Sequence, residues 1–303
     1  MKRAVSFLVT VYASVPVLLY LFPWILGHAI FAHLLRLPFF VDLGRPGDIV
    51  NHTCNFYLDT EEDVSVGVWH TLPASQWKEA VGKSPEWYRE TLGDGHPVIV
   101  YLHGNIGTRW DESGGIETLE FILMESSGYY MTVQSSKRFG DSSGEPSEAG
   151  LTSDALYLYQ WVKERSRGSL VCLWGHSLGS GVATNAAVKL QEKGGLKVTN
   201  RILQKYFSEN LNPLFLQMYM FLPGFQSLLW NTLDKNNIEF ANDKNLKTLT
   251  GPLLILHAED DNVVPYHMGL KVQLVLHSKW MFANRGFSHS NIYLDPDLPN
   301  VVR

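Results

Sequence analysis

A serine stands between two glycines where an apolar run meets a small-residue segment, in "VCLWGHSLGSGVATNAA" (171–187). A serine hydroxyl is a poor nucleophile at neutral pH and needs a base within hydrogen-bonding reach. A sharp turn from a strand into a helix would expose the hydroxyl of Ser177, and the glycines leave room for the tight backbone. The motif therefore predicts a nucleophilic serine. The alternative is a glycine-tolerant turn in which Ser177 caps the helix.

A nucleophilic serine also needs donors for the negative charge that develops on the attacked carbonyl. The helix after Ser177 would offer the backbone N–H of Leu178, and a second donor is expected from an earlier loop at the end of a strand. The segment "VYLHGNIGT" (100–108) fits that description. We expect the N–H of Asn105 to be the second donor, with Ile106 as the other candidate and a turn without chemical role as the alternative.

The acid of a serine, acid and histidine set should follow the serine and precede the histidine. The segment "LHAEDDNVVP" (256–265) offers three consecutive carboxylates. Asp261 lies directly before the Asn-Val-Val-Pro turn and is the expected acid. Glu259 and Asp260 are predicted to be solvated charges of the loop.

The expected base is His289, in "GFSHS", because it follows the last predicted strand. His267 is too close to Asp261 in sequence to fold back comfortably, and His277 falls within the predicted strand itself. No H-E-x-x-H or C-x-x-C pattern is present, so we expect neither a metal nor a cofactor.

Apolar runs that alternate with helical patterns must position these residues. A helix is expected over 154–168, and strands are expected at 63–72, 96–102, 169–174, 251–258 and 270–280. Strands alternating with helices predict a mostly parallel sheet. Ligands bind beyond the carboxyl ends of such strands, where the loops of Ser177, Asp261 and His289 would meet.

The composition limits the class of protein. The chain has 303 residues, of which 45% are hydrophobic, and a formal net charge of −5. This balance excludes wholesale disorder and provides no basic surface for nucleic acid. Two cysteines occur, and Cys172 falls in an apolar run, where a buried thiol is expected rather than a disulfide.

The N-terminus carries no charged residue from Ala4 to Leu35, a length sufficient to cross a bilayer as a helix. A cleaved signal peptide is the alternative, with residues 27–29 as the cleavage site. An uncleaved anchor is favoured because the apolar region is about twice the usual 7–15 residues. Asn51 begins the chain's single glycosylation sequon, just beyond this region, and favours a lumenal or extracellular catalytic side.

Taken together, "LWGHSLGSGVATNAA", "YLHGNIGT", "LLILHAEDDNVVP" and "NHTCNFYLDTEEDVSVGVWHTLPA" resemble the membrane-anchored lysophosphatidylserine lipases of the α/β-hydrolase-domain family. The resemblance implies an α/β-hydrolase fold with a small cap, and a triad of Ser177, Asp261 and His289. It also implies a serine hydrolase of the endoplasmic reticulum membrane, single-pass and facing the lumen. Its expected substrates are acyl esters of lysophosphatidylserine and of monoacylglycerols.

The expected domain organisation combines the apolar N-terminus with this resemblance. We expect a membrane anchor with its flanks at 1–36 and an extension with early strands at 37–93. The catalytic domain is expected at 94–303, with a cap at about 205–240. Residues 213–230 could form the part of the cap that admits acyl chains, or an ordinary core helix.

Three segments depart from the family pattern: 135–138, the weak strand pattern at 196–212, and the short connection at 266–271. The chain also ends at Arg303, before the expected closing helix. A crossover between parallel strands generally needs a dozen or more residues, so the short connection predicts a displaced His289. The alternative function is therefore a binding protein whose triad residues are present but misaligned.

Overall fold

The computed structural model describes residues 2–31, 42–48, 50–61, 64–104, 129–133, 146–194, 202–204, 219, 222–261, 263–264, 266–267, 269–270, 280–289 and 291–298. The strands are β1 (Thr53–Glu61), β2 (Val64–Thr71), β3 (Val98–Leu102), β4 (Tyr129–Val133), β5 (Val171–Gly175), β6 (Ile202–Gln204), β7 (Leu253–Ala258) and β8 (Trp280–Asn284). The helices are α1 (Lys2–Leu21), α2 (Trp24–Phe31), α3 (Trp77–Ala80), α4 (Pro85–Thr91), α6 (Glu148–Arg165), α7 (Leu178–Glu192), α9 (Phe225–Lys235) and α10 (Asn242–Thr248), with short 3₁₀ turns at Pro46–Asp48, Ala74–Gln76 and Ile292–Leu294.

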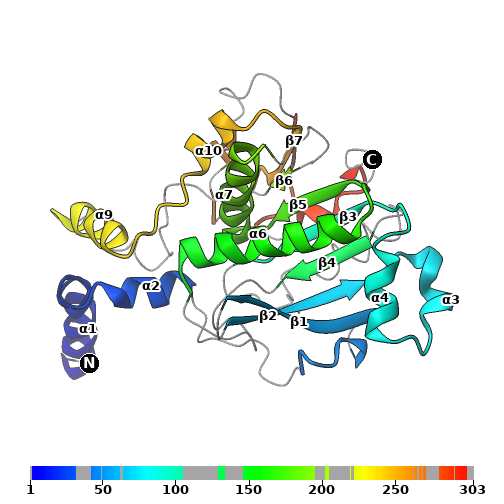
Figure 1. Cartoon of the computed structure of the whole chain (residues 1–303). Helices are drawn as coiled ribbons and strands as arrows, with labels where there is room; N and C mark the ends of the chain where they lie inside the picture. Colours follow the sequence, from blue (N-terminus) through cyan, green and yellow to red (C-terminus); the bar gives the residue numbers. More distant parts are fainter. Residues whose placement is uncertain are drawn as a thin grey trace.

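The strands form one sheet in the order β1-β2-β4-β3-β5-β6-β7-β8 (Figure 1). β2 pairs antiparallel with β1 and β4, and every pairing from β4 to β8 is parallel. The predicted mostly parallel sheet with helices is confirmed. The strand order reverses at β3, because β4 lies on one side of it and β5 on the other. Such a reversal opens a crevice at the carboxyl ends of the strands.

The centre of the sheet is buried on both faces. In β3, Val98, Val100 and Leu102 join the core that includes α6 and α7, whereas Ile99 and Tyr101 join a second core that contains Leu254, Ile292 and Leu298. This explains the continuous apolar sequence of β3 and β5, since a strand covered on both faces does not alternate. β2, predicted as half-buried from its alternating valines, is almost completely buried as well.

One strand prediction needs correction. The strand that pairs with β7 is β8, Trp280–Asn284, so the prediction of 270–280 was placed too early; Leu270 is helical, and 271–279 lie outside the described residues. The segment at 196–212, predicted to be a poor central strand, contributes the three-residue β6 between β5 and β7. Ladder hydrogen bonds on both sides compensate for its weak strand pattern.

The expected single N-terminal helix is divided into α1 and α2. Pro23 lacks an N–H and disfavours helical geometry at Phe22, so the helix breaks there. In the part of the chain that the structure describes, no single helix has the length and hydropathy of a membrane span. The segments Tyr12–Leu21 and Trp24–Phe31 meet that criterion only as a pair, with a bend of 113° between them.

The bent helix pair packs against α9 (Figure 1). The Nδ2 of Asn236 donates to the carbonyl of Pro23 at 2.9 Å, and the rings of Tyr12 and Tyr219 stack with centroids 4.3 Å apart. Leu26 and Ile30 of α2 are buried in the main core. Helix α9 lies in the predicted cap, but most of 205–221 lies outside the described residues, so the boundaries of the cap and of the other domains stay predictions.

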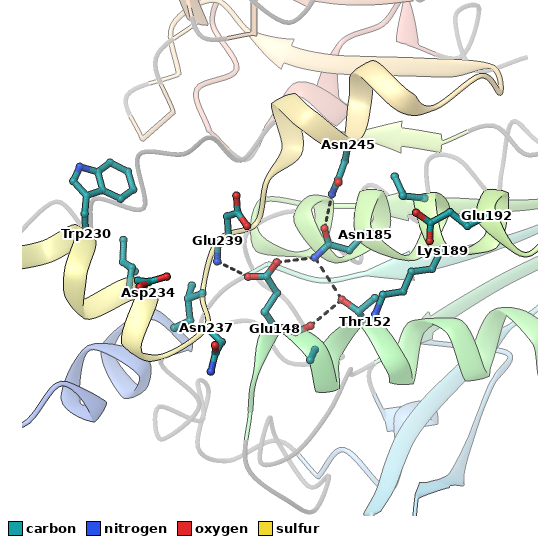
Figure 2. Close-up of a pocket in the computed structure, with 14 residues that line it drawn as sticks. Glu148, Thr152, Asn185, Lys189, Glu192, Trp230, Asp234, Asn237, Glu239 and Asn245 are labelled. Atoms are coloured by element: carbon teal, nitrogen blue, oxygen red, sulfur yellow. Dashed lines mark hydrogen bonds between the residues drawn. The ribbon is translucent and has the colours of Figure 1, made fainter.

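Glu148, the first residue of α6, connects three parts of the fold (Figure 2). Its Oε2 accepts hydrogen bonds from the backbone N–H groups of Glu239 at 2.6 Å and Phe240 at 2.9 Å. Its Oε1 accepts from Nδ2 of Asn185 on α7 at 2.8 Å. These contacts tie the start of α6 to α7 and to the segment between α9 and α10, beside a cavity of about 750 Å³.

We predict that Glu148→Ala destabilises the chain. The substitution removes the acceptor of the N–H groups of Glu239 and Phe240, and it leaves the amide of Asn185 only its longer contact with Thr152 at 3.5 Å. Hydrogen bonds to a charged group contribute roughly 1.5–3 kcal/mol each at most. The free energy of unfolding in urea should fall by about 1–3 kcal/mol. The exposed Glu79→Ala is the control; equal midpoints for both variants would contradict the proposed role of Glu148.

Candidate active site

Ser177 occupies the turn between β5 and α7 in a strained conformation, with φ 50° and ψ −117°. A non-glycine residue at such an angle costs about 1–3 kcal/mol and persists only where its surroundings enforce it. The hydroxyl makes no capping hydrogen bond to the described residues of α7, so the alternative of a helix-capping serine is wrong. Instead, Ser177 Oγ lies 3.2 Å from Nε2 of His289.

The two glycines of the motif allow this turn to pass close to β3. A Cβ at Gly179 would lie 2.0 Å from the carbonyl oxygen of Leu102, and one at Gly175 would lie 2.3 Å from the carbonyl oxygen of Gly179. Each added carbon would overlap backbone atoms, which cannot move aside as the end of a flexible side chain could. The spacing of Gly175 and Gly179 therefore reflects the close packing of β5, α7 and β3 beneath Ser177.

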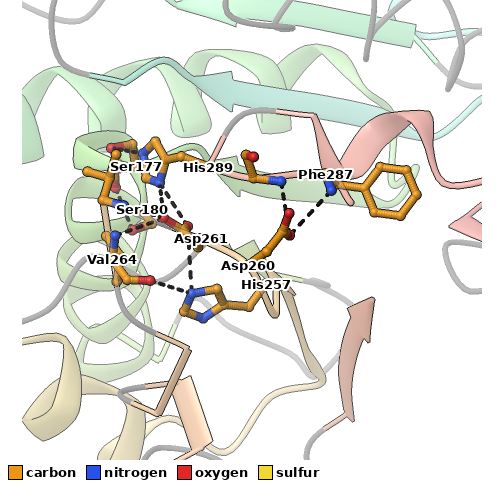
Figure 3. A network of polar contacts seen from close by, with 10 residues as sticks. Ser177, Ser180, His257, Asp260, Asp261, Val264, Phe287 and His289 are labelled. Carbon is orange, nitrogen blue, oxygen red and sulfur yellow. Dashed lines mark hydrogen bonds and ion pairs between the residues drawn. The ribbon is translucent and has the colours of Figure 1, made fainter. Parts of the chain in front are cut away.

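Three loops after three parallel strands bring the candidate residues together (Figure 3). Ser177 follows β5, Asp261 follows β7 and His289 follows β8. The side chains are enclosed: Ser177 is 8% exposed and Asp261 7%. The short connection at 266–271 had predicted a displaced His289, and the 3.2 Å contact with Ser177 contradicts that prediction.

Asp261 fixes the imidazole from the other side. Its Oδ2 lies 2.8 Å and its Oδ1 3.0 Å from Nδ1 of His289. Oδ1 also accepts from the N–H groups of Val263 at 2.9 Å and Val264 at 2.8 Å. Burial acts to raise the pKa of the Asp261 carboxyl, but the hydrogen bonds and charge of His289 and the two N–H donors outweigh it and hold the pKa below its ordinary value. An ionised Asp261 keeps the proton of His289 on Nδ1, which leaves Nε2 as the acceptor that faces Ser177.

The expected oxyanion donors are described only in part. Leu178 is the first residue of α7, so its N–H has no acceptor within the helix. The loop after β3 approaches from the other side, since a Cβ on Gly104 would lie 3.2 Å from Cβ of Ser177. Asn105 and the alternative Ile106 lie outside the described residues, and the second donor stays a prediction.

The other residues considered from the sequence have different positions. His267 is exposed, and His277 lies outside the described residues. Asp260 is exposed and Glu259 half-buried, in agreement with the prediction of solvated loop charges, but both carboxylates also have partners. Glu259 pairs with Arg285 at 2.9 Å, and Oδ1 of Asp260 accepts from the backbone of the loop that carries His289.

His257 is a further residue at the site that sequence reasoning missed. It is fully buried on β7, and its Nε2 lies 2.9 Å from the carbonyl oxygen of Val264. Because a carbonyl only accepts, this nitrogen carries a proton. The contact closes the turn whose N–H groups bind Asp261. The continuous apolar run of β7 could have predicted that His257 is buried, but not which groups it contacts.

Other candidate sites are not evident in the described ranges. No cluster of three or more His, Cys, Asp or Glu residues there could hold a metal ion. The cavity between α6, α7, α9 and α10 (Figure 2) is lined by neither Ser177, Asp261 nor His289. It is therefore distinct from the site that these three residues form.

The fold is similar to those of solved hydrolases. An α/β-hydrolase from Vibrio vulnificus matches with a TM-score of 0.64 and 15% identity, covering 92% of this chain and 91% of that one. An esterase from Pyrococcus furiosus matches with a TM-score of 0.60 and 14% identity, covering 85% and 90%. At these identities the likeness concerns the fold, which is that of the α/β-hydrolases. No protein-family profile matches the chain.

Relatives found by their sequences have higher identities to the chain than these solved structures have. The chain is 41% identical to the lysophosphatidylserine lipase ABHD12 of Gallus gallus over 320 residues, covering 100% of this chain and 83% of that protein. It is 40% identical to the protein of the same name from Danio rerio, with 100% and 82% covered, and 40% identical to the human protein ABHD12B, with 90% and 78% covered. The chain belongs to the ABHD12 family, and its class is that of the carboxylic-ester hydrolases.

We predict that Asp261→Asn lowers kcat for a p-nitrophenyl ester by about 10³–10⁴-fold, because a neutral amide no longer holds the imidazole in the tautomer that accepts from Ser177. The measurement is the initial rate of the full chain in detergent, with KM determined separately. The exposed Asp234→Asn is the matched control. Near-normal turnover in Asp261→Asn would contradict the orienting role of this carboxylate.

Proposed function

We propose that the chain is a membrane-bound serine hydrolase that cleaves the acyl ester of lysophosphatidylserine and of monoacylglycerols through Ser177, His289 and Asp261. The observation that carries this proposal is the chain of two contacts, 3.2 Å from Ser177 Oγ to Nε2 and 2.8 Å from Nδ1 to Asp261. The substrate follows from the relatives, several of which are named lysophosphatidylserine lipases.

In the first half-reaction, Ser177 Oγ attacks the acyl carbonyl carbon while His289 Nε2 takes the hydroxyl proton. The carbonyl oxygen becomes an oxyanion, held by the N–H of Leu178 and by that of Asn105. Asp261 stabilises the imidazolium that forms. When the tetrahedral intermediate collapses, the ester C–O bond breaks and His289 returns its proton to the leaving glycerol oxygen, which leaves an acyl group on Ser177.

In the second half-reaction, water replaces the leaving alcohol. His289 takes a proton from the water as it attacks the acyl carbonyl, and the same N–H groups hold the second oxyanion. Collapse breaks the bond between the acyl carbon and Ser177 Oγ, and His289 protonates the serine. The products are a fatty acid and the glycerol-based alcohol, and the enzyme returns to its starting protonation state.

The N-terminal helix pair supports attachment to a bilayer. Its elbow exposes a run of large apolar side chains, each more than 40% accessible: Val17, Leu18, Tyr20, Leu21, Phe22 and Trp24. Aromatic and aliphatic side chains of this kind partition into the interface of a membrane. A substrate with one acyl chain would then reach Ser177 from the membrane surface to which the enzyme is attached.

A lumenal position in the endoplasmic reticulum is supported by Asn51. Its side chain is exposed in the turn before β1, two residues ahead of Thr53 in an Asn-His-Thr sequon. An exposed acceptor in a turn is the arrangement that glycosylation requires, and the reaction occurs only on the lumenal side. We therefore propose a lumenal catalytic domain.

The full chain in detergent micelles should release fatty acid from lysophosphatidylserine and should bind a fluorophosphonate probe covalently. Ser177→Ala removes the attacking oxygen and should lower kcat by about 10⁴-fold or more and abolish labelling. Ser75→Ala changes an exposed serine and should match the wild type. A folded wild-type chain that neither turns over an ester nor reacts with the probe would defeat the proposal.

Synthesis in the presence of microsomes should give a product that stays in the pellet after alkaline carbonate extraction and that shifts in size on endoglycosidase treatment. Asn51→Gln should lose the shift but stay in the pellet, because only the acceptor has changed. A wild-type chain released by carbonate would refute stable membrane attachment. A chain retained in the pellet without any shift would refute the lumenal topology.

A further inference from the structure

The loop that carries His289 is strained. Two residues between β8 and His289 have positive φ angles, Gly286 at 93° and Ser288 at 50°. Glycine adopts such an angle freely, but serine does so at a cost of roughly 1 kcal/mol or more. Ser288 directly precedes the histidine, so its backbone angle decides where the imidazole of His289 points.

A neighbouring side chain enforces this conformation. Oδ1 of Asp260 accepts hydrogen bonds from the backbone N–H of Ser288 at 3.1 Å and from that of Phe287 at 3.3 Å (Figure 3). Asp260 lies on the loop after β7, beside Asp261. The loop after β7 therefore restrains His289 in two ways. Asp261 binds the imidazole ring, and Asp260 binds the backbone of the residue immediately before the histidine.

We propose that Asp260 is a positioning residue for the ester hydrolysis, one that holds Ser288 in its left-handed conformation so that Nε2 of His289 reaches Ser177. This inference rests on the proposed function of Ser177 and His289. It assigns to Asp260 no contact with substrate. Its effect is exerted through the direction of the imidazole.

The contact depends on an acceptor atom in one place. Both N–H groups bind the same oxygen, Oδ1, which an asparagine carbonyl can replace without its charge. Partial desolvation acts to raise the pKa of the Asp260 carboxyl, but N–H donors including those of Ser288, Gly286 and Phe287 outweigh it and keep the pKa below its ordinary value. Asp260 is therefore an acceptor throughout the neutral range, and geometry rather than charge is the property to test.

Glu259 offers a control from the same loop. Its carboxylate pairs with Nε of Arg285 at 2.9 Å, but the guanidinium side chain is 81% exposed. An exposed ion pair contributes little to structure, and neither of its members binds the backbone beside His289. Removal of the Glu259 carboxylate thus changes the charge of the loop without removing the acceptor of Ser288.

The experiment compares wild type, Asp260→Ala, Asp260→Asn, Asp260→Glu and Glu259→Ala as full chains in detergent, with kcat and KM for a p-nitrophenyl ester. A misplacement of about 1 Å can lower a rate about 100-fold, so Asp260→Ala should lose about 10- to 100-fold in kcat with KM changed less than about twofold. Asp260→Asn should stay within about threefold of wild type, because it keeps the acceptor. Asp260→Glu keeps the charge but moves the acceptor by one methylene, and should fall below Asp260→Asn.

The measured rates test the positioning role of Asp260 and the proposed function separately. Normal kcat in Asp260→Ala overturns the proposal, as does an Asp260→Asn variant that is as impaired as Asp260→Ala. If Asp260→Ala does not fold, the order of the other two substitutions decides: Glu above Asn indicates a role of charge and overturns the positioning role. Loss of activity in Glu259→Ala equal to that in Asp260→Ala would also overturn it. An inactive wild type refutes the proposed function itself, whereas an active wild type with unaffected Asp260 variants refutes only the positioning role.

Discussion

The contact between Ser177 and His289 joins residues 112 positions apart in the chain, and most features of the fold serve to make it short. A hydroxyl and an imidazole interact usefully only within about 3 Å, and neither side chain can travel far from its backbone. The serine must therefore stand at the top of β5 in a conformation that serine disfavours. The histidine must come back from the end of β8 to meet it. The sheet sets the distance between the two loops.

Backbone packing supplies the rigidity that this contact needs. Gly179 brings α7 against the end of β3 so closely that a single added carbon would overlap the carbonyl of Leu102. The helix then cannot slide, and the strained turn of Ser177 cannot relax into an ordinary helix cap. On the other side, Asp261 and Asp260 restrain the ring and the backbone of the histidine loop. Ser177 itself and Ser288, which directly precedes His289, are both strained, and hydrogen bonds and packing offset the cost of both.

The N-terminal helices are part of the folded body and not an appended tail. Leu26 and Ile30 contribute to the main core, and Asn236 of the α9 region donates to the carbonyl of Pro23 at the break between the helices. Helix α9 also contacts both α1 and α2. Membrane attachment at the elbow would therefore orient the hydrolase domain relative to the lipid surface. For a substrate that resides in that surface, the orientation of the strand ends would matter as much as the chemistry above them.

The amino-acid sequence determined the strand-to-helix turn at Ser177, because glycine spacing and an apolar run with small residues beyond it constrain the local backbone. It also determined the order in which serine, acid and histidine follow one another. It left open whether a short connection and a weak strand could still close the sheet, because ladder hydrogen bonds come from neighbours distant in sequence. Only the tertiary structure decided that the three-residue β6 suffices, that β8 begins at Trp280, and that the helix breaks at Pro23 with a bend of 113°. Likewise, the contacts of Asp260 and His257 could not be predicted from the sequence, since their hydrogen bonds go to backbone groups, which every residue carries.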